Sequence, residues 1–119
     1  MMFVAVIVFV TIMENAHAAL TITGTTGAKY LISGMPTTTA PDAILKIVFE
    51  NRTHGTNLSL CAGTMADFNA GKCTMQLSSS GGPGFAFLTI MDAKALLGKV
   101  IYVIRNVGTV NSQFILTIE

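Results

Sequence analysis

The chain has 119 residues, of which 51% are hydrophobic and 11% charged, and its formal net charge is +1 at pH 7. Its seven basic residues are scattered singly, so the clustered basic face of a nucleic-acid-binding protein is missing and we expect no nucleic-acid partner. A chain of this length forms one domain that can bury a core of its own.

The first eighteen residues have the pattern of a secretory signal peptide. A continuous apolar run at residues 3–13 precedes Ala16-His17-Ala18, and a short hydrophobic segment that ends in Ala-x-Ala is typical of a leader. The run is shorter than the roughly 20 residues of a membrane-spanning helix. A buried N-terminal strand and an uncleaved anchor are the alternatives, and no basic residue precedes the run. We therefore expect a cleaved leader at residues 1–18, a single mature domain at residues 19–119, no stable membrane span and a secreted or periplasmic location.

Short apolar and β-branched runs, each bounded by Gly, Pro, Asn or Ser, fill the rest of the chain, as in an all-β sandwich or barrel. The expected strands are residues 20–23, 30–32, 44–50, 57–61, 73–77, 85–90, 100–105 and 113–119. Residues 44–50 indicate a central strand, because Leu45, Ile47 and Phe49 fall on one face while Lys46 and Glu50 fall on the other. Residues 85–90 are apolar on both faces and are expected to be covered on each side or to lie near the centre of the core.

One short helical turn is expected at residues 92–98. Asp92 is suited to cap its start and Gly98 to end it. Leu96 and Leu97 are expected to pin this turn to the core.

Cys61 and Cys73 are predicted to form a disulfide. Two cysteines in a secreted chain meet an oxidising compartment, and closing this loop is expected to stabilise the fold by about 3 kcal/mol. Two buried free thiols are the alternative. A metal site is disfavoured because no His or second Cys pair lies at ligand spacing.

The segment between the cysteines is a candidate binding loop. Met65, Asp67, Phe68 and Asn69 lie among small and polar residues, and a disulfide at the base of such a loop would restrain its tip. In the alternative interpretation Met65 and Phe68 fold back as a lid over one end of the core. Replacement of Phe68 by alanine separates the two, since only a lid residue loses stability.

No catalytic residue, metal ligand or cofactor is predicted. His54 is the only histidine outside the leader, no Gly-x-Ser-x-Gly nucleophile context is present, and the carboxylates stand apart in the sequence. Residues 78–84 are Gly-rich, but they lack the Lys-Ser/Thr ending of a phosphate-binding loop. Asn51 and Asn57 begin glycosylation sequons, which matter only on a eukaryotic secretory route.

Leu97-Gly98, Tyr102, Ile104 and Asn106, followed by a hairpin and a closing strand, resemble the end of a fibronectin type III or related immunoglobulin-like domain. In those folds a tyrosine near a strand bonds back to upstream backbone. The resemblance covers the last quarter of the chain. It implies a small immunoglobulin-like antiparallel sandwich of seven or eight strands and no particular activity.

These observations favour a secreted, non-enzymatic binding or interaction domain that acts at or beyond the cell surface, with an unknown protein or glycan as its partner. A structural subunit of a surface fibre or extracellular matrix is the alternative, because hydrophobic strands at both chain ends suit strand exchange. A small secreted hydrolase or hydrolase inhibitor ranks third.

Overall fold

The computed structural model describes residues 20–32 and 44–118, which form eight strands and two short helical segments. The expected leader at residues 1–18 lies outside the described residues. In chain order the elements are β1 (Leu20–Ile22), β2 (Lys29–Ile32), β3 (Ile44–Asn51), β4 (Asn57–Gly63), α2 (Met65–Ala70), β5 (Met75–Ser80), β6 (Phe87–Asp92), the 3-10 turn η1 (Ala93–Leu96), β7 (Val100–Val107) and β8 (Ser112–Ile118).

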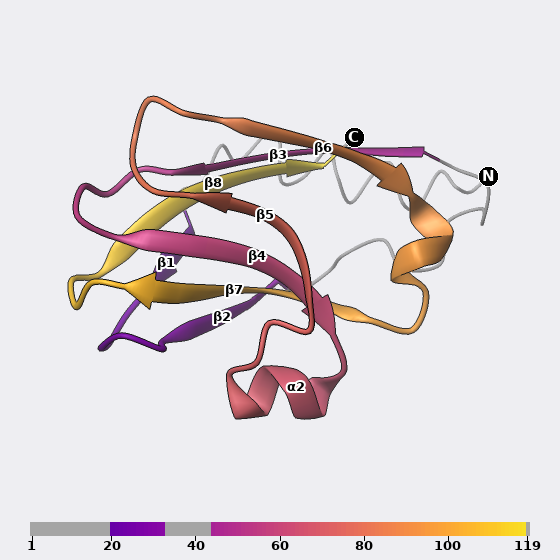
Figure 1. Cartoon of the computed structure of the whole chain (residues 1–119), viewed down its shortest axis with the longest axis horizontal. Helices are drawn as coiled ribbons and strands as arrows, with labels where there is room; N and C mark the ends of the chain where they lie inside the picture. Colours follow the sequence, from indigo (N-terminus) through magenta and orange to yellow (C-terminus); the bar gives the residue numbers. More distant parts are fainter. Residues whose placement is uncertain (1–19, 33–43, 119) are drawn as a thin grey trace.

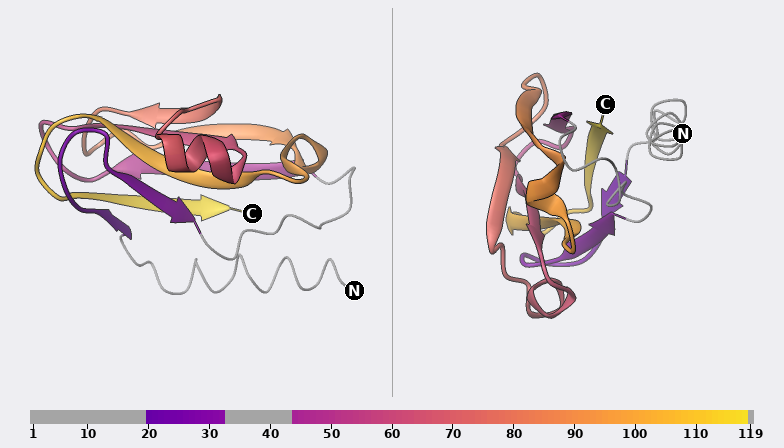
Figure 2. Two further views of the ribbon diagram at one scale, coloured as in Figure 1. Left: turned by 90° about the horizontal axis from the view of Figure 1, so that it is seen from below. Right: turned by 90° about the vertical axis from the view of Figure 1, so that its right-hand side faces the viewer.

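Two four-stranded antiparallel sheets pack face to face as a β-sandwich (Figures 1 and 2). The strand order is β1-β8-β3-β6 in the first sheet and β2-β7-β4-β5 in the second. Strand β3 is central in its sheet, as its alternating pattern predicted. The expected sandwich of seven or eight strands is confirmed, and so is a helical turn near residues 92–98, where η1 lies.

The core lies between the sheets and follows the two-residue period of the strands. Leu45, Ile47 and Phe49 of β3 are buried and point inward. The Phe114 ring of β8 lies 5.6 Å from the Phe49 ring and 5.7 Å from the Tyr30 ring of the opposite sheet. These aromatic contacts join the two sheets at the centre of the sandwich.

The expectation that residues 85–90 are covered on both sides is wrong. The strand begins at Phe87 and borders the first sheet, with β3 as its only partner among the described residues. Leu88 is 54% exposed and Ile90 is 63% exposed. Apolar residues on both faces are compatible with a buried central strand. Here, however, the chain continues after β6 into β7 of the other sheet, so no described strand pairs with the second edge of β6.

The details expected for the helical turn are also partly wrong. Asp92 precedes η1 without a capping hydrogen bond from its side chain, and Leu97 is 44% exposed. Leu96 and Ala93 are buried there and anchor the turn to the core.

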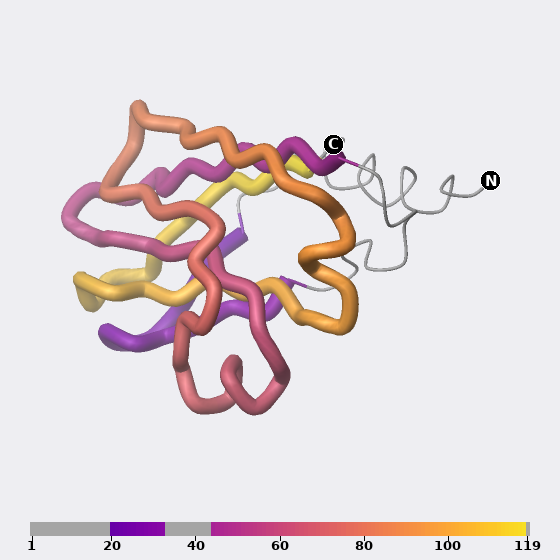
Figure 3. The backbone as a smooth tube through the Cα atoms, turned by 45° about the vertical axis from the view of Figure 1, so that its right-hand side comes forward, coloured from indigo at the N-terminus to yellow at the C-terminus, as the bar shows by residue number. Residues whose placement is uncertain are grey.

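Three turns gather at one end of the sandwich: residues 23–28 between β1 and β2, residues 52–56 between β3 and β4, and residues 108–111 between β7 and β8 (Figure 3). The Thr26 hydroxyl donates a hydrogen bond to the Gly108 carbonyl at 2.7 Å. Gly108 has φ +105°, and a Cβ there would lie 2.7 Å from the Thr56 methyl carbon, so only glycine fits this close approach.

Arg105 is fully buried at this end, although arginine is rarely buried without a carboxylate partner. Its guanidinium donates instead to the carbonyls of Gly24 and Thr25 in the first turn and to the carbonyl of Val110 in the last turn. It also donates to the Ser112 hydroxyl at 3.3 Å. The buried Arg105 guanidinium therefore links the β1–β2 turn to the β7–β8 turn, although Arg105 and Gly24 are 81 residues apart in the sequence.

Candidate functional site

The predicted disulfide between Cys61 and Cys73 is present, with the two Cα atoms 5.4 Å apart. It closes the segment that carries α2, which extends below the second sheet in Figure 1. Thr64 and Asp67 form a reciprocal capping box at the start of this helix, and Gly71 ends it in the left-handed conformation. The loop is therefore a short, capped helix with a covalent closure at its base.

The four residues of the candidate binding loop have different surroundings. The Phe68 ring packs edge-on against the Tyr102 ring, with 5.5 Å between the centroids. The ammonium group of Lys29 lies 5.0 Å from the centre of the Phe68 ring and donates to the Asn69 carbonyl at 2.5 Å. Asp67 caps the helix, while Met65 is 45% exposed. Of the four candidates, Met65 and Asn69 are thus the exposed ones, whereas Asp67 and Phe68 are partly buried.

Phe68 belongs to a small second core on the outer face of the second sheet. Cys61, Tyr102 and Ile104 are buried there, and Phe68 and Cys73 pack against them. The helix α2 thereby covers part of this outer face.

Replacing Phe68 by alanine is expected to lower the free energy of unfolding by about 2 kcal/mol, because the change removes a half-buried ring and its contact with Tyr102. Urea unfolding of the purified protein measures the loss. Met65→Ala is the matched control on the same helix and is expected to change stability by about 0.5 kcal/mol or less. Equal stabilities of the two variants would contradict the packing role of Phe68.

The Asp67 carboxyl should make the stability of this loop sensitive to acid. The hydrogen bond from the Thr64 backbone N–H holds the pKa of Asp67 below its ordinary value of 3.8, and a hydrogen bond from the Thr74 side chain lowers it further. A lowered folded-state pKa gives stability that is complete above the unfolded pKa, at about pH 4, and is lost as the pH falls through the folded value. We expect the melting temperatures of the wild type and Asp67→Asn to differ most above about pH 4 and to converge at lower pH. A difference that does not change with pH would contradict this assignment.

A second candidate surface is a shallow groove of about 410 Å³ beside the loop between β5 and β6. His54 contributes from the β3–β4 turn, and Phe87 contributes from the start of β6. The complete lining is His54, Gly81, Gly82, Pro83, Phe85 and Phe87. Phe85 is 66% exposed and Phe87 is 44% exposed, so the groove presents two accessible aromatic rings.

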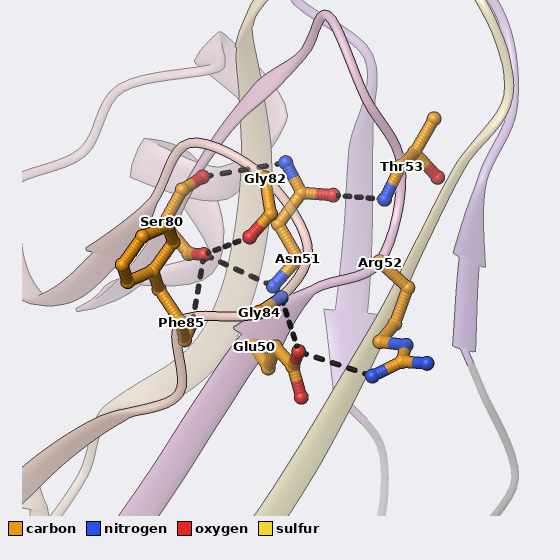
Figure 4. A network of polar contacts seen from close by, with 8 residues as sticks. All are labelled: Glu50, Asn51, Arg52, Thr53, Ser80, Gly82, Gly84 and Phe85. Atoms are coloured by element: carbon orange, nitrogen blue, oxygen red, sulfur yellow. Dashed lines mark hydrogen bonds and ion pairs between the residues drawn. The ribbon is translucent and has the colours of Figure 1, made fainter.

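A network of hydrogen bonds fixes the loop that carries Phe85 (Figure 4). The Glu50 carboxylate accepts from the Gly84 backbone N–H at 2.9 Å and from the Arg52 guanidinium at 3.0 Å. The Ser80 hydroxyl oxygen accepts from the Asn51 backbone N–H at 3.1 Å and lies 3.4 Å from the Phe85 carbonyl. The end of β3 thus holds both ends of the glycine-rich loop.

Asn51 is the buried centre of this network, which bears on the first sequon. Its amide nitrogen donates to the Thr56 hydroxyl at 2.8 Å and to the Ser80 carbonyl at 3.3 Å, and the residue is fully buried. A glycan on this nitrogen would replace those hydrogen bonds and needs solvent. Asn57, in contrast, is partly exposed, and its side chain pairs with Asn106 at 2.9 Å.

Within residues 20–32 and 44–118, no three His, Cys, Asp or Glu side chains stand close enough to hold a metal ion. In the same part of the chain, no helix is long and apolar enough to cross a membrane.

No protein family model, curated protein or solved structure matches the chain.

Proposed function

We propose that this protein is a secreted, non-enzymatic binding domain that acts at or beyond the cell surface. The observation that carries the proposal is the groove lined by Phe85, Phe87 and His54 on a loop held by hydrogen bonds. Large exposed aromatic rings are costly in water, and they are enriched where proteins bind partners. A loop that is already fixed loses little conformational entropy on binding, which favours affinity.

The chemistry of the groove favours a protein segment with apolar side chains as the partner. Phe85 and Phe87 offer two rings, whereas the polar groups are the His54 imidazole and the backbone of the glycine-rich loop. A glycan offers many hydroxyl groups and needs a denser set of hydrogen-bonding side chains. A surface glycan is therefore the second choice.

The disulfide supports the extracytoplasmic part of the proposal, because such bonds persist in oxidising compartments. An immunoglobulin-like classification is also part of the proposal. It is supported by the two antiparallel sheets and by Tyr102, whose hydroxyl donates to the Lys72 carbonyl upstream in the chain. This tyrosine lies within β7 and its acceptor lies thirty residues away, so it departs from the usual corner arrangement.

Selection of linear peptides on the immobilised protein tests the proposed site. We expect the selected peptides to be rich in apolar residues and Phe85→Ser to weaken their binding at least tenfold, since burial of a phenylalanine ring contributes about 1.5–3 kcal/mol. Val110→Ser is the matched control, because Val110 is similarly exposed on the β7–β8 turn.

Peptide selection that fails, or peptides that bind Phe85→Ser as tightly as the wild type, would overturn the groove as a peptide site. A parallel glycan array decides the second choice. Glycan binding that Phe85→Ser abolishes would assign the same groove to a sugar.

A further inference from the structure

Among the sheet edges in the described part of the chain, strand β6 has the fewest features that prevent pairing with another chain. Natural edge strands avoid pairing with other chains by being very short, by carrying lysine or proline, or by containing a bulge. Strand β1 has only three residues, β2 has four and begins with Lys29, and β5 joins β4 through a register shift. Strand β6 has six residues, FLTIMD, without Lys, Arg, Pro or Gly.

The free edge of β6 also carries exposed apolar side chains. In Figure 1 this strand lies in front of its partner β3, and β5, the edge strand of the second sheet, lies below it. The Thr89 hydroxyl donates to the Leu77 carbonyl of β5 at 2.8 Å, so the two edges meet at this corner of the sandwich. Leu88 and Ile90 point to the outer face of the sheet and are 54% and 63% exposed. Phe87 points the other way and is 44% exposed. Helix α2 covers part of the outer face of the second sheet, whereas no described element covers Leu88 and Ile90.

We propose that two copies of this chain associate by pairing β6 with β6 in antiparallel orientation, so that their first sheets join into one continuous eight-stranded sheet. Phe87 also lines the groove proposed above, but Leu88 and Ile90 belong to the strand edge alone, so substitutions there test this inference separately from the groove.

The sequence of β6 is self-complementary in one register. Residues that face each other across an antiparallel pair point to the same face of the sheet. With Thr89 of each copy on the two-fold axis, Leu88 lies opposite Ile90 of the second copy, and Phe87 lies opposite its Met91. Every pair within the strand is then apolar or Thr with Thr. The register centred on Ile90 would instead set Leu88 against the Asp92 carboxylate, so the centre at Thr89 is favoured.

Charge and area are compatible with a reversible dimer. The chain has a formal net charge of +1 at pH 7, so two copies repel each other little. The exposed parts of Phe87, Leu88 and Ile90 amount to roughly 300 Å² in each copy. This area is below that of a standard stable interface, and the main-chain hydrogen bonds of the new strand pair add to it. We expect a dissociation constant on the order of 10–100 µM.

A two-fold pairing is closed, because the free β6 edge of each copy is occupied by the other copy. It therefore produces dimers and not larger assemblies. The fibre alternative needs a head-to-tail contact between two different edges. Strand β1 is the other edge of the same sheet, and its three residues make a poor partner for the six of β6.

Light scattering and sedimentation of the protein expressed from the full-length chain test the dimer from 10 µM to 1 mM. We expect the wild type to move from monomer to dimer over this range and Ile90→Lys to weaken association at least thirtyfold. Val110→Lys, at a similarly exposed position outside β6, should dimerise like the wild type. A wild type that stays monomeric at 1 mM, or that grows beyond dimers, would overturn the proposal, as would an unchanged association of Ile90→Lys.

Cysteine crosslinking tests the register without relying on the lysine variant. A mixture of Leu88→Cys and Ile90→Cys chains should form a mixed disulfide dimer about tenfold faster than either chain alone, since these positions face each other across the pair. Equal rates in all three samples would overturn the Thr89-centred register. Ile90→Lys is also expected to bind the selected peptides normally, and Phe85→Ser to dimerise normally, so failure of one proposal is distinguishable from failure of the other.

Discussion

Replacement of Arg105 by alanine is expected to cost about 4 kcal/mol of the free energy of unfolding. The guanidinium is fully buried and donates to the carbonyls of Gly24, Thr25 and Val110 and to the Ser112 hydroxyl. Alanine leaves these acceptors without their donor and leaves a cavity where the side chain lay. Urea unfolding followed by circular dichroism measures the loss.

Arg52→Ala is the matched control for this prediction. Arg52 is an exposed arginine whose guanidinium pairs with Glu50 at 3.0 Å, with 47% of its side chain accessible. Exposed ion pairs contribute about 0–1 kcal/mol, so this variant should remain close to the wild type. A loss at Arg105 no larger than the loss at Arg52 would contradict the role of the buried guanidinium.

Removal of the disulfide by the double substitution Cys61→Ala and Cys73→Ala is expected to cost about 3 kcal/mol. The bond closes a segment with a sequence separation of 12, and the loss of this constraint on the unfolded chain accounts for most of the effect. Cys61 is also fully buried against Tyr102, so its truncation adds a small packing loss. Thermal unfolding with and without a reductant measures the contribution.

The reductant itself supplies the control. It should lower the melting temperature of the wild type by about as much as the double substitution does, and it should leave the double variant unchanged. A wild type that melts at the same temperature in both conditions would contradict a stabilising disulfide.

The strands were predictable wherever one face of the sheet meets the core. The alternation of Leu45, Ile47 and Phe49 with Lys46 and Glu50 placed β3 correctly, because burial on one face imposes a two-residue period. No such contrast exists in β6, where both faces are apolar. Its position at an edge depends on which strands pair with it in its own sheet. The residues of β6 alone do not determine how many neighbouring strands it has.

The helix α2 escaped prediction although its ends carry clear signals. Thr64 and Asp67 have the spacing of a capping box, and Gly71 follows at the usual position of a helix end. The segment between them has only six residues and buries none of them fully, so it shows no apolar periodicity. The capping residues at the two ends, and not a hydrophobic pattern, were the signal in the sequence that could have predicted this helix.

Arg105 and the groove depend on contacts between distant segments. The acceptors of Arg105 lie in turns that precede and follow it, and an arginine at the end of an apolar run is ordinarily exposed. Likewise, Glu50 and Gly84 meet only because the β3–β4 and β5–β6 connections reach the same groove. In the sequence, His54 and the glycine-rich segment belong to separate loops, and no local pattern predicts that both line the same groove.

The central claim is that this chain is a disulfide-closed domain that works outside the cytoplasm, and intact mass spectrometry tests it most directly. The full-length chain is expressed in a secreting bacterial host, and the protein is recovered from the periplasm or medium. We predict a chain that begins at Ala19, lighter by two hydrogen atoms than its fully reduced form. A full-length product that starts at Met1, remains in the cytoplasm and carries free thiols at Cys61 and Cys73 would contradict the account.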